Sequence, residues 1–319
     1  MIRHRLLALV LLALTGCAAR YAPPAADPAG APRLGDDVAI MADGARLAVA
    51  GWGERTEPAV VFLALHGFND YRCAFAVPAP TLAGQEALLI AFDQRGFGAD
   101  PQAGLWPGND RLVRDAEAMI RLVAGRYPRA RVYLLGESMG AAVALQAAAG
   151  PAASRLAGLV LVAPAVWGWS TLNPFYAWSL RLASAIVPWW RPTGESLGRV
   201  PTNNIDVLRV MGRDPKVIKK TRIAAIKGLV DTMDEGLGAA GAIQPHWLAL
   251  YGGRDEIIPP GPVKTLEARL PETGKLVRFA DRYHMMLRDV GRDRAIAAVR
   301  SFAGLTPVPA KTPTRPDDV

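Results

Sequence analysis

Short, continuously apolar runs alternate along most of the chain with longer segments in which apolar residues recur at helical spacing. A run that is apolar at every position is typical of a strand buried in a parallel sheet. The alternation therefore predicts βαβ units on a mostly parallel sheet flanked by helices. The predicted strands cover 38–41, 46–51, 59–65, 87–92, 131–135, 158–162, 247–251 and 275–279, and the predicted helices cover 110–126, 139–149, 262–269 and 286–302.

The stretch from about residue 165 to residue 244 interrupts this alternation. It opens with clustered aromatic residues between Trp167 and Trp178, continues through the letters PWW at 188–190, and then becomes helical and basic. We predict that it forms a cap inserted between two strands. The pattern leaves two interpretations of its tryptophans open: contact with an apolar substrate, or packing that holds the cap on the core.

The first sixteen residues have the pattern of a secretory signal peptide. Arg3 and Arg5 precede an uncharged run at 6–14, which is too short to cross about 30 Å of hydrocarbon. The run ends in the letters LTGC, with Gly16 just before Cys17. This ending resembles the bacterial lipobox, which implies cleavage before Cys17 and acylation of its thiol. An ordinary secretory signal with an incidental cysteine is the alternative.

Lipidation implies a position in the bacterial cell envelope. Several acyl chains, at about 0.8 kcal/mol per buried CH₂, hold a protein on a membrane surface without a transmembrane helix. Ala18 follows the cysteine, and by resemblance to enterobacterial sorting it favours the outer membrane, facing the periplasm. Composition further predicts a flexible tether at 17–35, a folded domain at 36–305 and a disordered tail at 306–319.

Charge and composition exclude several classes of partner. The chain has 37 Lys and Arg against 29 Asp and Glu, a net charge of +8, which becomes +6 once the two arginines of the predicted signal peptide are removed. The positive residues are scattered, which argues against nucleic-acid binding. The two cysteines and four histidines do not have the spacing of metal ligands, so we expect no metal site. Gly96 and Gly98 lack the third glycine of a dinucleotide-binding loop, so we expect no cofactor.

The strongest chemical signal is the sequence GESMG at 136–140, which has the form G-x-S-x-G. It lies between the predicted strand 131–135 and the predicted helix 139–149, where this pattern forms a sharp strand-to-helix turn. Such a turn raises the serine hydroxyl above the sheet, and the helix N-terminus favours a developing negative charge. We therefore predict that Ser138 is a nucleophile; a tight structural turn is the alternative.

A second turn, HGF at 66–68, follows the predicted strand 59–65. The backbone N–H groups of Phe68 and Met139 are the predicted oxyanion hole. His66 precedes the serine in the chain and lies just before the turn. We interpret it as a structural hydrogen-bonding residue rather than as the catalytic base.

The base is expected downstream of the acid, and His284, just past the last predicted strand, meets that condition. His246 begins a strand, and we interpret it as structural. Asp255 is the predicted acid because it follows a buried strand and a Gly-Gly turn. Glu256 and Asp281 remain alternatives for this role.

These motifs together resemble the α/β-hydrolase superfamily, and within it the monoacylglycerol lipase and lysophospholipase-like branch of the serine aminopeptidase S33-type hydrolases. The resemblance covers roughly residues 36–305 and implies a mostly parallel, eight-stranded sheet with an inserted helical cap. The chain departs from many relatives at Glu137, where they carry His, and at Phe97, where they also carry His. The motifs that carry the resemblance are HGF at 66–68, D-x-R-G-x-G at 93–98, GESMG at 136–140, the letters AP at 163–164 before the cap, G-x-x-D-x-I-x-P at 252–259, and His284.

The resemblance implies a serine hydrolase of carboxylic esters that needs no cofactor. Ser138 would attack the carbonyl, His284 would transfer the proton, and Asp255 would orient the imidazole. The aromatic cap and the lipid anchor favour lipid-like substrates such as monoacylglycerol or lysophospholipid. The alternatives are a peptidase or thioesterase of the same fold, and a non-catalytic envelope lipoprotein that uses the scaffold for binding.

Overall fold

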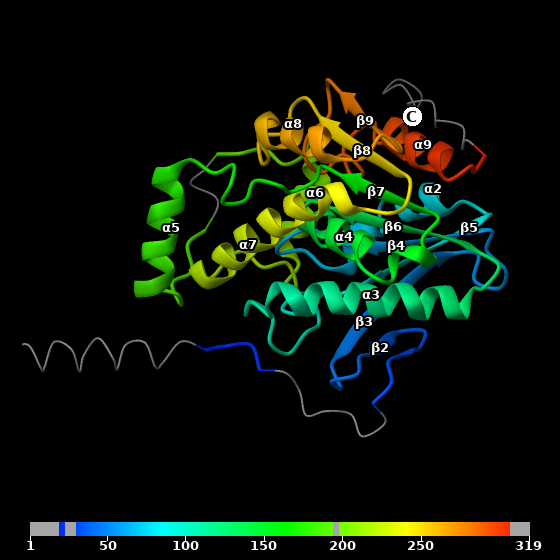
Figure 1. Ribbon diagram of the computed structural model, residues 1–319, viewed down its shortest axis with the longest axis horizontal. Helices are drawn as coiled ribbons and strands as arrows, with labels where there is room; N and C mark the ends of the chain where they lie inside the picture. The colour runs from blue at the N-terminus through cyan, green and yellow to red at the C-terminus, as the bar shows by residue number, and fades with distance from the viewer. Residues whose placement is uncertain (1–18, 23–29, 194–197, 307–319) are drawn as a thin grey trace, which may run out of the picture.

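A nine-stranded sheet forms the centre of the molecule, in the order β1-β2-β3-β5-β4-β6-β7-β8-β9 (Figure 1). The computed structural model describes residues 19–22, 30–193 and 198–306. Six strands from β5 to β9 in this order run parallel, and β1, β2 and β3 join them antiparallel. The strands are β1 (Arg33–Leu34), β2 (Val38–Ile40), β3 (Arg46–Gly53), β4 (Val60–Leu65), β5 (Ala87–Phe92), β6 (Arg131–Glu137), β7 (Gly158–Val162), β8 (Trp247–Gly252) and β9 (Gly274–Phe279).

Helices cover both faces of this sheet. Apolar side chains of α3, α4 and α8 pack in the core on one face, and those of α2 and α9 pack on the other. Strands β4 and β5, buried at every position, lie between these two layers. The helices outside the cap are α2 (Ala79–Ala83), α3 (Asn109–Arg126), α4 (Met139–Ala149), α8 (Pro260–Arg269) and α9 (Asp293–Phe302), with 3₁₀ turns η1 (Arg72–Phe75), η2 (Ala153–Arg155) and η4 (Ala240–Ala242).

The predicted mostly parallel α/β architecture is confirmed, with two differences in detail. The described sheet has nine strands rather than eight. The additional strand, β1, has two residues, lies inside the segment predicted as a tether and pairs with β2. The last helix begins at Asp293 rather than at 286. Before it, the Asp289 carboxylate accepts hydrogen bonds from the Tyr283 N–H and the Thr202 hydroxyl, so this stretch is held as turns.

The cap is built from three helices between β7 and β8: α5 (Pro174–Ile186), α6 (Ile205–Arg213) and α7 (Ile223–Ala239). Helix α7 packs against α4, and α5 packs against α7 at the outer end of the molecule (Figure 1). Two of the cap tryptophans fit the two interpretations that the sequence left open, one each, and Trp178 fits neither. Trp167 lines the main cavity, the Trp169 indole donates a hydrogen bond to Asp231, and Trp178 is exposed.

The N-terminal segment contacts the domain before β1. The Tyr21 hydroxyl donates a hydrogen bond to Asp100 at 2.9 Å, and the backbone of Ala22 exchanges two hydrogen bonds with the Gln102 side chain. The segment predicted as a tether is therefore held at these residues. At the other end, the first residue of the predicted tail, Thr306, accepts hydrogen bonds from Arg300 through its carbonyl oxygen. The predicted signal peptide, Cys17 and the rest of the predicted tail lie outside the described residues. Among the helices that the structure describes, none has the length and apolarity needed to cross a membrane.

Candidate active site

Strand β6 and helix α4 meet at Ser138, which has a positive φ of 56°. This conformation is strained for a residue that carries a side chain. Close approach of the backbone requires glycine on both sides of the turn. A Cβ atom on Gly136 would lie 2.4 Å from the Gly140 carbonyl oxygen, and one on Gly140 would lie 2.1 Å from the Leu65 carbonyl oxygen. The turn therefore lifts the serine hydroxyl out of the sheet at the ends of β4 and β6.

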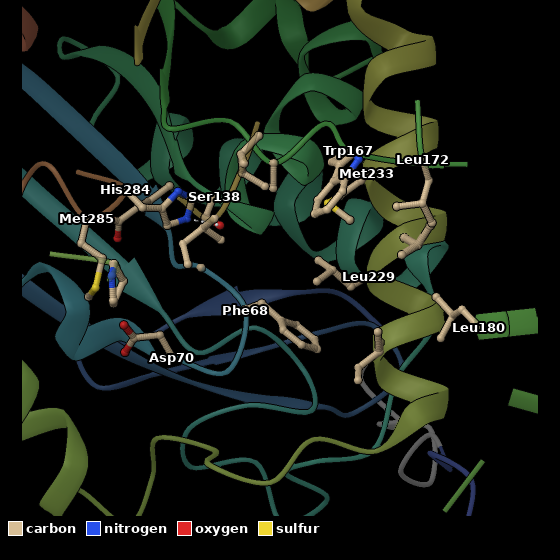
Figure 2. A pocket seen from close by; sticks show the side chains of 18 of the residues that line it. Phe68, Asp70, Ser138, Trp167, Leu172, Leu180, Leu229, Met233, His284 and Met285 are labelled. Carbon is tan, nitrogen blue, oxygen red and sulfur yellow. Dashed lines mark hydrogen bonds between the residues drawn. The ribbon is translucent and has the colours of Figure 1, made fainter. Parts of the chain in front are cut away.

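The structure joins Ser138, His284 and Asp255 in one chain of hydrogen bonds (Figure 2). His284 Nε2 lies 2.9 Å from Ser138 Oγ, and His284 Nδ1 lies 2.8 Å from Asp255 Oδ2. The other oxygen of the buried Asp255 carboxylate accepts hydrogen bonds from the N–H groups of Ile257 and Ile258. Because the carboxylate only accepts, Nδ1 carries the proton and Nε2 is free to accept from the serine hydroxyl.

The two rival carboxylates are engaged elsewhere. The exposed Glu256 side chain accepts a hydrogen bond from the Val200 N–H at 2.8 Å. Asp281 pairs with Arg282 and Arg294, and the hydrogen bond from Arg282 lowers the pKa of Asp281 to about 2. Geometry therefore separates three carboxylates that sequence alone left open, and it places Asp255 against the imidazole.

His66 is buried beside the second turn. Its Nε2 accepts a hydrogen bond from the Gln94 N–H at 3.0 Å, so its Nδ1 carries the proton and donates to the Gly67 carbonyl at 2.8 Å. Burial lowers the pKa of His66, which favours this neutral form. These bonds fix the turn that carries Phe68. His246 lies just before β8, with its Nδ1 3.1 Å from the Thr273 carbonyl oxygen.

The two predicted oxyanion-hole residues lie on the two segments that flank Ser138. Met139 is the first residue of α4, so its backbone N–H has no acceptor within that helix. Phe68 lines the same cavity as Ser138. Leu65 pairs with Gly136 across β4 and β6, which brings the Phe68 turn and the Ser138 turn out of the sheet side by side.

A cavity of about 750 Å³ opens above Ser138, between the sheet and the cap. Figure 2 shows that its two ends differ in chemistry. Asp70 and Met285 lie on one side of the serine. Apolar side chains extend along the other side, toward the cap; they include Trp167, Leu172, Leu180, Leu229 and Met233.

The polar end holds a buried ionic network that sequence reasoning missed. The Arg288 guanidinium pairs with Asp70 at 2.7 Å and with Glu137 at 3.2 Å, and all three side chains are at most 6% exposed. Burial raises the pKa of Glu137, while the charge of Arg288 opposes the shift. One oxygen of Glu137 has no hydrogen-bond partner. Glu137 stood out in the sequence as a departure from His, but nothing there connected it to Arg288.

Comparisons with known proteins agree with this geometry. The family model described as "Serine aminopeptidase, S33" matches residues 56–291, which is most of the chain. The chain belongs to the serine aminopeptidase S33 family. The match contains the turns at 66–68 and 136–140, the cap, and the hydrogen-bonded residues Ser138, Asp255 and His284.

The monoglyceride lipases to which this chain is similar are distant in sequence. The mouse monoglyceride lipase is 23% identical over 258 residues, which is 79% of this chain and 84% of the mouse protein. The rat monoglyceride lipase is 27% identical, over 51% of this chain and about half, 53%, of its own length. Among solved structures, the fold is similar to that of a soluble variant of the monoglyceride lipase of Saccharomyces cerevisiae, which was solved in complex with a substrate analogue. The TM-score is 0.69 at 16% sequence identity, and the match covers 90% of this chain and 98% of the yeast chain. The last likeness confirms the α/β-hydrolase fold.

Proposed function

We propose that this S33 family member is a serine hydrolase that cleaves carboxylic esters with lipid-like acyl chains. One observation carries the proposal: the hydrogen-bonded series Ser138, His284 and Asp255 lies at the base of a largely apolar cavity. A nucleophile, a base and an orienting carboxylate in this geometry suit acyl transfer through a covalent intermediate. The distant relation to monoglyceride lipases supports the same reaction class.

The proposed reaction follows from the atoms in place. His284 Nε2 takes the proton of Ser138 as Oγ bonds to the ester carbonyl carbon, and the carbonyl oxygen gains the negative charge. The N–H groups of Phe68 and Met139 hold that oxyanion. The imidazolium, oriented by Asp255, then protonates the departing alkoxide as the carbon–oxygen bond breaks. Water, deprotonated by His284, then attacks the acyl carbon. The bond from that carbon to Ser138 Oγ breaks, the imidazolium returns its proton to Oγ, and the acid is released.

The two ends of the cavity support a lipid-like substrate. The apolar side, lined by Leu172, Leu180 and Leu229, suits an acyl chain, since each buried CH₂ group gains about 0.8 kcal/mol. The polar side, with Asp70 and the free oxygen of Glu137, suits an alcohol that carries hydrogen-bond donors. Monoacylglycerol and lysophospholipid are the proposed substrates.

Membrane attachment is part of the proposal. Cys17, after the apolar run at 6–14, would carry the acyl chains of a bacterial lipoprotein, in the outer membrane facing the periplasm. The mass of the N-terminal peptide tests this directly. A Cys17 peptide with acyl mass supports lipidation, and an unmodified N-terminal peptide refutes it.

The catalytic proposal is tested by labelling the purified chain with a fluorophosphonate, which reacts with activated serines. We expect label on Ser138, none after Ser138→Ala, and unchanged labelling after Ser179→Ala, which removes another serine of the same cavity. Turnover of a short-chain ester should be lost with the label.

A panel of oxygen esters, thioesters and amides of increasing acyl length then defines the substrate class. We expect kcat/KM to rise with chain length for oxygen esters. A folded chain that takes no label refutes the hydrolase and favours the non-catalytic binding lipoprotein. A flat response to chain length refutes the lipid-like substrate, and a preference for amides or thioesters favours the peptidase or thioesterase.

A further inference from the structure

The side chain of Phe68 belongs to a group of three aromatic rings behind its turn. The Phe68 ring meets the Phe97 ring edge to face, with centroids 5.7 Å apart, and meets the Trp106 ring at a tilt, with centroids 6.2 Å apart. Phe97 and Trp106 meet edge to face at 6.4 Å. Figure 2 shows the Phe68 side chain pointing away from Ser138 and His284. The rings therefore hold the turn from the side opposite the reacting atoms.

Trp106 also contacts the cap. A Cβ atom on Gly228 of α7 would lie 2.3 Å from two indole atoms of Trp106, Cε2 and Nε1. The indole therefore lies directly on the backbone of α7, where only glycine leaves room for it. Because the same indole packs against Phe68, Trp106 joins α7 to the turn of the predicted oxyanion hole.

Helix α7 supports the other half of the predicted oxyanion hole as well. A Cβ atom on Gly236, further along α7, would lie 2.7 Å from the carbonyl oxygen of Ala142 on α4. Helix α4 begins at Met139, the second predicted donor. Both predicted N–H groups thus rest on one cap helix, one through α4 and the other through Trp106. Their separation decides whether both can reach a single oxygen atom at about 2.7–3.1 Å.

We propose that Trp106 is a positioning residue for the oxyanion hole. It holds the Phe68 turn against α7 at the separation from Met139 that lets both N–H groups donate to one carbonyl oxygen. Trp106 acts through Phe68 and not by touching the substrate. This inference rests on the proposed function, and it adds a residue whose loss should weaken binding of the transition state more than binding of the ester.

The first test is the kinetics of a short-chain ester in Trp106→Leu, which removes the ring contacts with Phe68. We expect kcat to fall roughly 10–100-fold, less than the 10²–10³-fold that follows loss of a whole oxyanion-hole donor. KM should stay within about twofold, and the pH profile of kcat/KM should keep its shape, because His284 and Asp255 are untouched. Affinity for a boronic acid, which forms a tetrahedral adduct with Ser138, should fall by the same factor as kcat. A tryptophan that only stabilised the fold would lower the melting temperature and leave kcat and this affinity unchanged.

The close approach of Gly228 to Trp106 allows a test by size. Trp106→Phe keeps a ring beside Phe68 and should recover most of kcat. Gly228→Ala should lower kcat, because its methyl group displaces the indole. Gly228→Ala combined with Trp106→Phe gives the methyl group room, so its kcat should exceed that of Gly228→Ala alone. Trp169→Leu, which removes a half-buried tryptophan bonded to Asp231 of the same helix, is the matched control and should keep the parent kcat within about twofold.

Hydrogen exchange followed by mass spectrometry reads the turn without any need for turnover. Peptides covering residues 66–70 should exchange about fivefold faster in Trp106→Leu than in the parent chain, while peptides around His284 should not change. A parent-like kcat in Trp106→Leu would overturn the proposal, as would a loss of kcat without faster exchange at 66–70. A parent chain that turns over no ester refutes the proposed function instead. The exchange rate at 66–70 then decides alone whether Trp106 holds the turn.

Discussion

The buried network at the polar end of the cavity allows a quantitative prediction about stability. In Arg288→Met, the carboxylates of Asp70 and Glu137 stay in place without the guanidinium that pairs with both. Breaking a buried pair by removing one partner costs about 3–5 kcal/mol, because an uncompensated charge remains. A loss of about 4 kcal/mol is close to a thousandfold change in the folding equilibrium. It is also a large fraction of the 5–15 kcal/mol that is typical for a folded domain.

The pH dependence of this loss has a defined sign. Burial already raises the pKa of Glu137 in the folded chain above its ordinary value. The folded state therefore holds this proton to higher pH than the unfolded state, and the ionised carboxylate costs stability as the pH rises through the folded pKa. Without Arg288 the pKa of Glu137 rises further. The gap between the variant and the parent chain should thus be smallest in mild acid and widest near neutral pH.

Urea unfolding followed by circular dichroism, from pH 5 to pH 8, measures both effects. Arg114→Met is the control, because Arg114 and Asp110 form an ion pair with side chains 75% and 78% exposed, and its loss should cost no more than about 0.5 kcal/mol. Adding Glu137→Gln to Arg288→Met removes one stranded charge and should recover part of the stability. A loss below about 1 kcal/mol that does not change with pH would refute this account of the network.

Two further predictions concern the site. Asp255→Asn places an amide against His284 Nδ1 and favours the wrong imidazole tautomer, so ester kcat should fall roughly 10³–10⁴-fold while thermal stability changes little. Glu256→Gln is the control and should keep the kcat of the parent chain. A loss of kcat in Glu256→Gln but not in Asp255→Asn would make Glu256 the acid. Gly140→Ala puts a methyl group 2.1 Å from the Leu65 carbonyl oxygen, so the melting temperature and the activity should both drop; a melting temperature equal to that of the parent chain would contradict the close approach.

Local patterns were enough to predict the central sheet and its turns. Strands β4 and β5 are apolar at every position because both faces are covered by helices, and the sequence marks them for that reason. The turn at Ser138 was predictable because glycines stand at 136 and 140, where the backbone leaves no room for a side chain. Strand β1, with two residues, is too short to leave a periodic signal.

The sequence favoured Asp255 as the acid but could not exclude Glu256 and Asp281. All three are carboxylates near the ends of the last two strands, and the structure separates them by the direction in which each side chain is held. Two backbone N–H groups hold the Asp255 carboxylate toward His284, whereas Glu256 is held by Val200. The bonds that orient Asp255 are local, but the contacts that hold Glu256 and Asp281 elsewhere, and the one that brings His284 to Asp255, are tertiary, and no local pattern encodes them.

The network of Arg288 shows most clearly what such tertiary contacts add. Asp70 lies two residues after Phe68, Glu137 lies one residue before Ser138, and Arg288 lies four residues after His284. The segments that carry the proposed oxyanion hole, the proposed nucleophile and the proposed base come from distant parts of the chain, yet one buried guanidinium joins them. Each pair costs desolvation energy that a set of apolar side chains would avoid. The network gains little stability over apolar packing, yet it joins three segments of the site. Its best explanation is therefore the geometry that it imposes on Ser138, His284 and the turn at Phe68.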